Sequence, residues 1–158
     1  DVDGIINAIK LANDTLIAAG KTRPKIGVAA LNPHAGDNGN FGTEECDILA
    51  PAIEMARGLQ IDVDGPWPSD TVFLRGRDGK LDAVVTMYHD QGQIAMKMMG
   101  FDRGVTIAAG LPVPIATPAH GTAFDIAGKG IANLNATRKA FDILCRMGAN
   151  FRRDRLAA

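Results

Sequence analysis

Short apolar runs that alternate with helix-periodic segments constrain the fold of this chain more than any other feature. Three runs have the length and composition of buried strands: Ile26–Leu31, Ala83–Met87 and Val105–Ala108. Before the first of them, apolar residues recur at helical spacing from Ile5 to Leu16, and Gly20 follows as a stop signal. Strands that alternate with helices are typical of an α/β fold with a largely parallel or mixed sheet.

Weaker patterns predict the remaining elements. The segment Thr43–Glu45 combines a capping residue with an acidic first turn and predicts the start of a helix, in which Pro51 predicts a kink or a restart. Ile61–Val63 is a candidate short strand, and Gln91–Met99 is helix-like. A closing helix is expected over Asn135–Met147, with four apolar side chains facing inward: Ala140, Phe141, Leu144 and Met147.

Composition excludes several classes of protein. Lys and Arg number 17 and Asp and Glu number 18, and the resulting net charge of −1 argues against a nucleic-acid binder. With 46% hydrophobic and 22% charged residues, the chain is globular rather than disordered. No apolar run reaches the roughly 18 residues of a membrane span, and no signal-peptide pattern is present. We expect Cys46 and Cys145 to be buried thiols of a protein in the reducing cytoplasm.

The three histidines are the first candidates for chemistry. His34, His89 and His120 each lie in a loop or just past a predicted strand, beside small or acidic residues. Two or three imidazoles, together with carboxylates such as Asp70 or Asp90, would suit Zn²⁺, Mn²⁺ or a similar ion. The alternative is that loop histidines only form hydrogen bonds. Their spacing is too long for a local metal motif, so the residues by themselves leave both interpretations open.

Three other segments allow two interpretations each. The glycine-rich loop His34–Gly42 would hold an anion at a helix N-terminus, or is a connecting loop. The stretch His120–Asn133 would admit a flat ligand, with Asp125 accepting hydrogen bonds from a ribose, or is a turn followed by a short helix. Lys97, between Met96 and Met98, would serve as an acid or base, or extends into solvent.

Six segments together carry a specific pattern: Leu31–Gly36, Gly65–Thr71, Met87–Gly92, Gly100–Val105, Gly110–Pro112 and His120–Ala123. In order and spacing they resemble the 4-hydroxythreonine-4-phosphate dehydrogenase family, over nearly the whole chain. The segments Gln93–Lys97 and Thr117–His120 look like the branch that acts on D-threonate or D-erythronate 4-phosphate. Thr106 and Ile115 stand where the pyridoxine-pathway enzymes have an asparagine and an arginine, and both are substrate contacts there.

The resemblance implies roles for individual residues. Two of the three metal-binding histidines of the family correspond to His34 and His89, and the third lies N-terminal to everything in this chain. The metal would be Zn, Mn, Mg or Co, with Asp70 and Asp90 nearby. Asp90 and Lys97 would be catalytic, and substrate would contact Lys97, Thr106 and Ile115. The residues that would bind NAD are His120, Gly121, Thr122, Asp125 and Asn133.

The resemblance also implies a fold and an organisation. The fold would be the layered α/β/α fold of isopropylmalate and isocitrate dehydrogenases, and this chain would be the C-terminal portion of a two-lobe, homodimeric, cytoplasmic enzyme. Residues 1–126 would belong to the metal- and substrate-binding lobe. Residues 127–158 would form the end of the cofactor loop and a helix that returns to the other lobe.

The implied activity is NAD- and divalent-metal-dependent oxidation, with decarboxylation, of a phosphorylated hydroxy acid. Candidate substrates are 4-hydroxythreonine 4-phosphate and D-threonate or D-erythronate 4-phosphate. A dihydrodiol carboxylate dehydrogenase of the same family is one alternative. The others are an inactive metal- or NAD-binding fragment and a non-catalytic dimerisation module.

Overall fold

The computed structural model describes the backbone of residues 1–157 and the side chains of residues 1–150. Packing divides the chain into two compact units. The first unit consists of Asp1–Ile17 and Lys21–Ala95. The second consists of the chain from Met96 onward together with the short segment Ala18–Gly20. The boundary expected at residue 126 concerned the lobes of a longer enzyme, and it stays a prediction.

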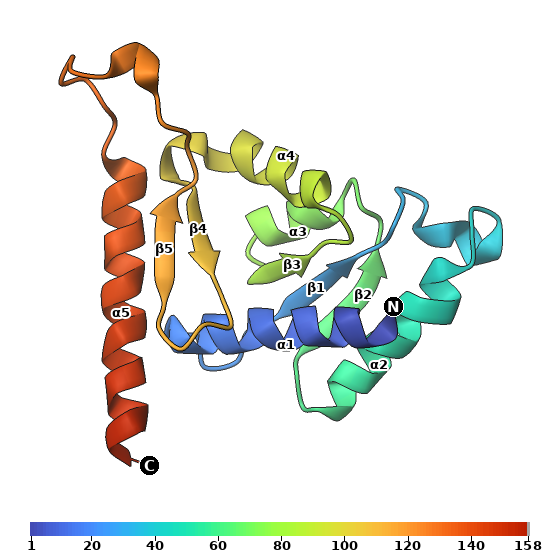
Figure 1. The fold of residues 1–158 in the computed structure, drawn as a ribbon. Coiled ribbons are helices and arrows are strands. Elements are labelled where there is room, and N and C mark those ends of the chain that lie inside the picture. Colours follow the sequence, from blue (N-terminus) through green and yellow to red (C-terminus); the bar gives the residue numbers. More distant parts are fainter. Residues whose placement is uncertain (158) are drawn as a thin grey trace. The chain divides into compact units, whose positions relative to one another are not determined.

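The first unit is built on a three-stranded parallel sheet in the order β2-β1-β3 (Figure 1). The central strand β1 (Ile26–Ala29) is buried along its whole length, as expected of a continuous apolar run between two neighbours. It pairs with β2 (Val63–Trp67) and with β3 (Ala83–Val85). The predicted α/β class is confirmed, but β2 begins where the candidate strand Ile61–Val63 was expected to end.

Helices cover this sheet and complete its core. Helix α1 (Val2–Ala18) buries Ile9, and α2 (Ala50–Gly58) buries Ile53 against the strand residues Val28, Val63 and Val85. Burial of a side chain the size of isoleucine stabilises the fold by about 1.5–3 kcal/mol. A kink or a restart was predicted at Pro51; there the helix continues, but a π-helical turn, η2 (Glu45–Leu49), changes into α2 at the preceding residue. Helices α3 (Val72–Arg77) and α4 (His89–Gly100) follow β2 and β3.

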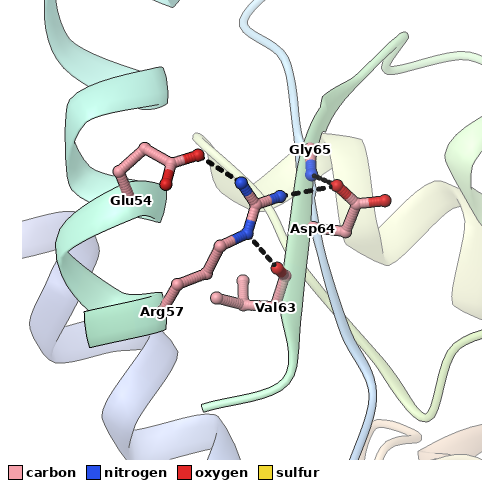
Figure 2. A network of polar contacts seen from close by, with 5 residues as sticks. All are labelled: Glu54, Arg57, Val63, Asp64 and Gly65. Atoms are coloured by element: carbon pink, nitrogen blue, oxygen red, sulfur yellow. Dashed lines mark hydrogen bonds and ion pairs between the residues drawn. The ribbon is translucent and has the colours of Figure 1, made fainter. Parts of the chain in front are cut away.

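Arg57 ties α2 to the edge strand β2 (Figure 2). Its Nε donates to the carbonyl oxygen of Val63 at 3.0 Å, and its Nη2 donates to Asp64 Oδ1 at 2.8 Å. Nη1 bonds to Glu54 on the same helix, and Asp64 Oδ1 also accepts the N–H of Gly65. The guanidinium therefore fixes the position of β2 through backbone and side chain together.

The second unit is a β-hairpin covered by a long helix. Strands β4 (Val105–Ala108) and β5 (Ile115–Pro118) pair antiparallel, and α5 (Asn135–Ala157) packs on both (Figure 1). Short 3₁₀ turns occupy η3 (Phe101–Arg103) and η4 (Phe124–Ile126). Strand β5 has no counterpart among the predicted elements, and α5 runs past the expected end at Met147.

Two expectations about burial are wrong. Phe141 was expected to face inward but is 67% exposed, because Ala136, Ala140 and Met147 set the buried face of α5 and Phe141 lies beside it. Cys46 and Cys145 are both exposed rather than buried. Cys46 follows Glu45, which with Leu49 forms the buried face of η2, so its own side chain points outward.

Among the described residues, none of the helices combines the length and the apolar character that crossing a bilayer requires. A loop of five residues, η1 (Ala35–Gly39), lies between β1 and η2 and needs backbone that glycine favours, with Gly36 at φ 75°. This loop belongs to the candidate site.

Candidate functional site

The carboxyl edge of the three-stranded sheet gathers the loops that carry most predicted site residues of the first unit. In parallel strands these ends meet at one edge, where ligands bind in open α/β sheets. A hollow of about 330 Å³ opens here, and its lining contains Asp70 from the β2 loop and Asp90 from α4. Pro33 and Tyr88, which precede His34 and His89 in the chain, line the same hollow. The structure therefore brings the two predicted carboxylates together.

His34 is held in a loop organised by Asn32. The Asn32 Oδ1 atom accepts the N–H of His34 at 2.9 Å and that of Gly36 at 3.3 Å, while Nδ2 donates to the carbonyl of Phe41 at 3.1 Å. The imidazole stacks on the Phe41 ring with a centroid distance of 4.5 Å. The ring is exposed, so its nitrogens are accessible to a ligand.

His89 is the first residue of α4 and pairs with its neighbour. Its Nδ1 lies 3.0 Å from Asp90 Oδ1, and both side chains are 77% exposed. A carboxylate on Nδ1 favours the tautomer that carries the proton there and leaves Nε2 as the free ligand nitrogen. The contact of Asp90 with Nδ1 is thus of the kind that orients a metal-binding imidazole.

Within the described residues, no three His, Cys, Asp or Glu side chains come together as a ligand set. The prediction placed the third histidine ligand outside this chain, so the assignment of His34 and His89 stays a prediction.

Two residues at this edge escaped the sequence analysis. Gln91 donates from Nε2 to the carbonyl of Ala30 at 2.9 Å and accepts the N–H of Met87 at 2.8 Å, so it joins the segments that follow β1 and β3. Glu45 accepts the N–H of Leu31 at 2.9 Å and is buried. The only sequence signal was the position of Glu45 in an acidic first turn, which predicts exposure.

The second unit has its own hollow, of about 350 Å³. Three of the five residues expected to bind NAD line this hollow: His120, Gly121 and Asn133. The remaining lining is largely apolar: Phe101, Asp102, Ala123, Ile126 and Ala132. Thr122 and Asp125 do not line this hollow. The short turn η4 inside His120–Asn133 agrees with the plainer of the two interpretations of that stretch.

The three predicted substrate contacts all lie in the second unit and are exposed. Lys97 occupies the last turn of α4, as expected of a lysine that extends into solvent. Thr106 is on β4 and Ile115 opens β5, where the two are two register positions apart on paired strands. Their roles stay predictions.

Comparison with known proteins identifies the family. The model of the pyridoxal phosphate biosynthetic protein PdxA matches residues 1–144. A Pseudomonas aeruginosa protein named "Putative 4-hydroxythreonine-4-phosphate dehydrogenase 2" is 64% identical over 143 residues, which are 89% of this chain and 42% of that protein. The D-threonate 4-phosphate dehydrogenase of Pectobacterium atrosepticum is 50% identical over 130 residues, 82% of this chain and 40% of its own.

Solved structures agree with these relatives. The 4-hydroxythreonine-4-phosphate dehydrogenase of Klebsiella pneumoniae superposes with a TM-score of 0.75 at 46% identity, covering 92% of this chain and 44% of that one. A terephthalate 1,2-cis-dihydrodiol dehydrogenase of Burkholderia xenovorans gives 0.72 at 31% identity, covering 94% and 47%. The chain spans about two fifths of the length of the curated relatives it matches. On these matches, the chain belongs to the PdxA family of pyridoxal phosphate biosynthetic proteins.

Proposed function

We propose that the protein to which this chain belongs is an NAD- and divalent-metal-dependent dehydrogenase of a phosphorylated hydroxy acid. The relatives support the class, since they are named as dehydrogenases of 4-hydroxythreonine 4-phosphate or D-threonate 4-phosphate. The observation that carries the proposal is the polar carboxyl edge of the sheet, where Asp70 and Asp90 share one hollow and Asp90 pairs with His89.

The donor set at this edge fits a divalent cation. Neutral imidazoles and carboxylates are the ligands that Zn²⁺ and Mn²⁺ accept in catalytic sites. His34 and His89 would hold the ion, with a further ligand from outside these residues, and Asp90 would orient His89. His34 and His89 are both exposed, as expected if residues from other parts of the protein complete the coordination of the ion.

The hollow of the second unit fits a flat ligand. Its apolar lining suits an adenine ring, while Asn133 and His120 offer polar groups at its wall. We therefore assign the adenosine portion of NAD to this hollow. Asp125 lies outside the lining, so its proposed contact with the ribose rests on the sequence pattern and the family resemblance and not on the geometry of this hollow.

The proposed reaction oxidises the substrate hydroxyl and then releases CO₂. When bound, the cation supplies Lewis acidity toward the oxygens of the substrate, and NAD⁺ supplies the hydride acceptor. The residues of this chain bind and orient the substrate: Lys97 pairs with its anionic groups and is the candidate for proton transfer, while Thr106 and Ile115 shape the site. Ile115 does not offer the guanidinium group that an arginine would provide at this position, and we therefore place the substrate among the four-carbon sugar-acid phosphates.

A turnover screen of the intact protein tests the proposal. The panel consists of D-threonate, D-erythronate and 4-hydroxythreonine 4-phosphates, each with its unphosphorylated form, with NAD⁺ and either Zn²⁺ or Mn²⁺. We expect NADH formation and CO₂ release with at least one phosphorylated acid. Absence of NADH formation with every member of the panel would contradict the proposal.

The dihydrodiol dehydrogenase of Burkholderia xenovorans keeps a second candidate open, because its fold matches over 94% of this chain. Its substrate carries no phosphate. An aromatic cis-dihydrodiol carboxylate is therefore added to the screen, and a preference for it over every phosphorylated acid would favour that candidate.

A further inference from the structure

Leu31 marks the point at which β1 becomes the loop that carries His34, and side chains hold its backbone there. The N–H of the preceding residue, Ala30, still pairs with the edge strand, donating to the carbonyl of Trp67 at 2.7 Å. Beyond it the pairing changes: the N–H of Leu31 donates to Glu45 Oε1 at 2.9 Å, and its carbonyl accepts Gln91 Nε2 at 3.3 Å. Two side chains from different helices thus replace strand partners.

Glu45 is a buried charged side chain, 3% exposed, in the part of the chain that the structure describes. Its Oε1 serves Leu31, and its Oε2 has no hydrogen-bond partner. Burial of a carboxylate that is only partly hydrogen-bonded opposes folding. The second oxygen lies against the loop, because a Cβ added to Gly36 would come within 2.8 Å of Oε2. Glu45 therefore contacts the chain on both sides of His34.

Gln91 connects the same segment to the other candidate ligand. Its Nε2 donates to the carbonyl of Ala30 at 2.9 Å, and its Oε1 accepts the N–H of Met87 at 2.8 Å. Met87 precedes His89 by two residues, and Gln91 follows it by two on α4. One amide group therefore sets the spacing between the chain that enters the His34 loop and the chain that enters the His89 helix.

We propose that Glu45 and Gln91 are positioning residues that hold the His34 loop and the His89 helix at the separation required to share one divalent cation. The inference rests on the proposed function, and it adds two residues that do not themselves bind the metal. Groups that hydrogen-bond directly to metal ligands change metal affinity by about 10- to 100-fold when they are replaced, and the lower end of that range is the scale expected for residues that hold the backbone beside the ligands.

Metal affinity of the intact protein tests the proposal. Zn²⁺ and Mn²⁺ dissociation constants are measured by competition with a chelator for the wild type, Glu45→Ala and Gln91→Met. The second variant keeps the approximate length of Gln91 and adds no charge, but it cannot donate to the carbonyls of Ala30 and Leu31. We expect each to weaken binding by about 10-fold or more. Glu44→Ala, which removes the neighbouring exposed carboxylate, is the matched control and should bind like the wild type.

The metal-free protein provides a second readout. Glu45→Ala should speed hydrogen exchange in the peptide that covers residues 30–42 while exchange in α1 stays unchanged. Glu45→Gln keeps an oxygen that accepts from Leu31 and should restore most of the affinity and the protection. If Glu45→Ala does not fold, Gln91→Met and Glu45→Gln still decide the question.

The outcomes separate the two proposals. Wild-type metal affinity in folded Gln91→Met and Glu45→Ala would overturn the positioning role and leave the proposed function intact. A wild type that binds neither metal would overturn both. Equal losses in Glu44→Ala would mean that net charge, and not the contacts on Leu31, controls binding, and would also overturn the inference.

Discussion

At the scale of single residues, the candidate site combines functional side chains that the sequence predicted with hydrogen-bonding side chains that it did not predict. Histidine and carboxylate side chains in loops after strands could be recognised from the sequence, and the structure gathers Asp70 and Asp90 in one hollow. Glu45 and Gln91 could not be recognised, because their contacts are with backbone groups 14 and 61 residues away. No local pattern encodes a hydrogen bond to a distant backbone N–H or carbonyl group.

The lining of the hollow in the second unit leads to a prediction about NAD binding. Asn133 lines it and Asp125 does not. Asn133→Ala in the intact protein should raise the KM for NAD⁺ several-fold, because a buried polar contact with a ligand contributes about 1 kcal/mol or more, and leave the KM for the hydroxy acid nearly unchanged. Steady-state kinetics with each substrate varied in turn measures both values. Equal changes in the two constants would remove Asn133 from the cofactor site.

Asp125→Ala is the companion variant. A larger rise in the KM for NAD⁺ than that of Asn133→Ala would favour the ribose contact implied by the family resemblance, and would show that the hollow is not the main determinant of cofactor affinity.

At the scale of elements, predictability followed the strength of the local pattern. The run Ile26–Leu31 predicted β1 because a central parallel strand is apolar throughout. Strand β5 (Ile115–Pro118) was missed because it lies between prolines and alternates exposed with half-buried residues, and only its pairing with β4 makes it a strand. The inward face of α5 was misassigned at Phe141 because two alanines, and not the largest apolar side chain, mark the buried face.

The contacts of Asp82, the residue just before β3, predict that the stability of the fold depends on pH. The pKa of Asp82 lies below its ordinary value of 3.8, mainly because Lys21 donates a side-chain hydrogen bond to it and also because the N–H of Lys25 donates another. A carboxyl group whose pKa is lowered by folding stabilises the folded state above its unfolded pKa, and this stabilisation is lost as the pH falls through the folded pKa. These contacts tie the chain before β1 to the start of β3.

Asp82→Asn should therefore lower the free energy of unfolding by about 1 kcal/mol at neutral pH. The difference from the wild type should shrink steadily as the pH is lowered below 3.8. Urea unfolding at a series of pH values checks this, with Asp78→Asn as the control because Asp78 pairs with its sequence neighbour Arg77 and so ties no distant segments together. A difference that does not change with pH would show that the carboxylate charge is irrelevant.

At the scale of the whole molecule, the chain contains two units whose candidate sites differ in chemistry. The first unit offers imidazoles and carboxylates at the edge of a parallel sheet, and the second offers an apolar hollow beside a β-hairpin. The family resemblance implies, as no pattern of periodicity can, that both take part in one reaction, and this stays a prediction. Because the chain spans about two fifths of its relatives, the complete ligand set and a homodimeric assembly are proposals for the intact protein.

The most direct test of the central claim is the metal stoichiometry and affinity of the intact protein in three variants, His34→Ala, His89→Ala and His120→Ala. We predict that the wild type binds one Zn²⁺ or Mn²⁺ per chain and that His34→Ala and His89→Ala each weaken binding by at least about 10-fold. His120→Ala, in the second unit, should bind the metal like the wild type. Unchanged stoichiometry and affinity in His34→Ala and His89→Ala would contradict the account.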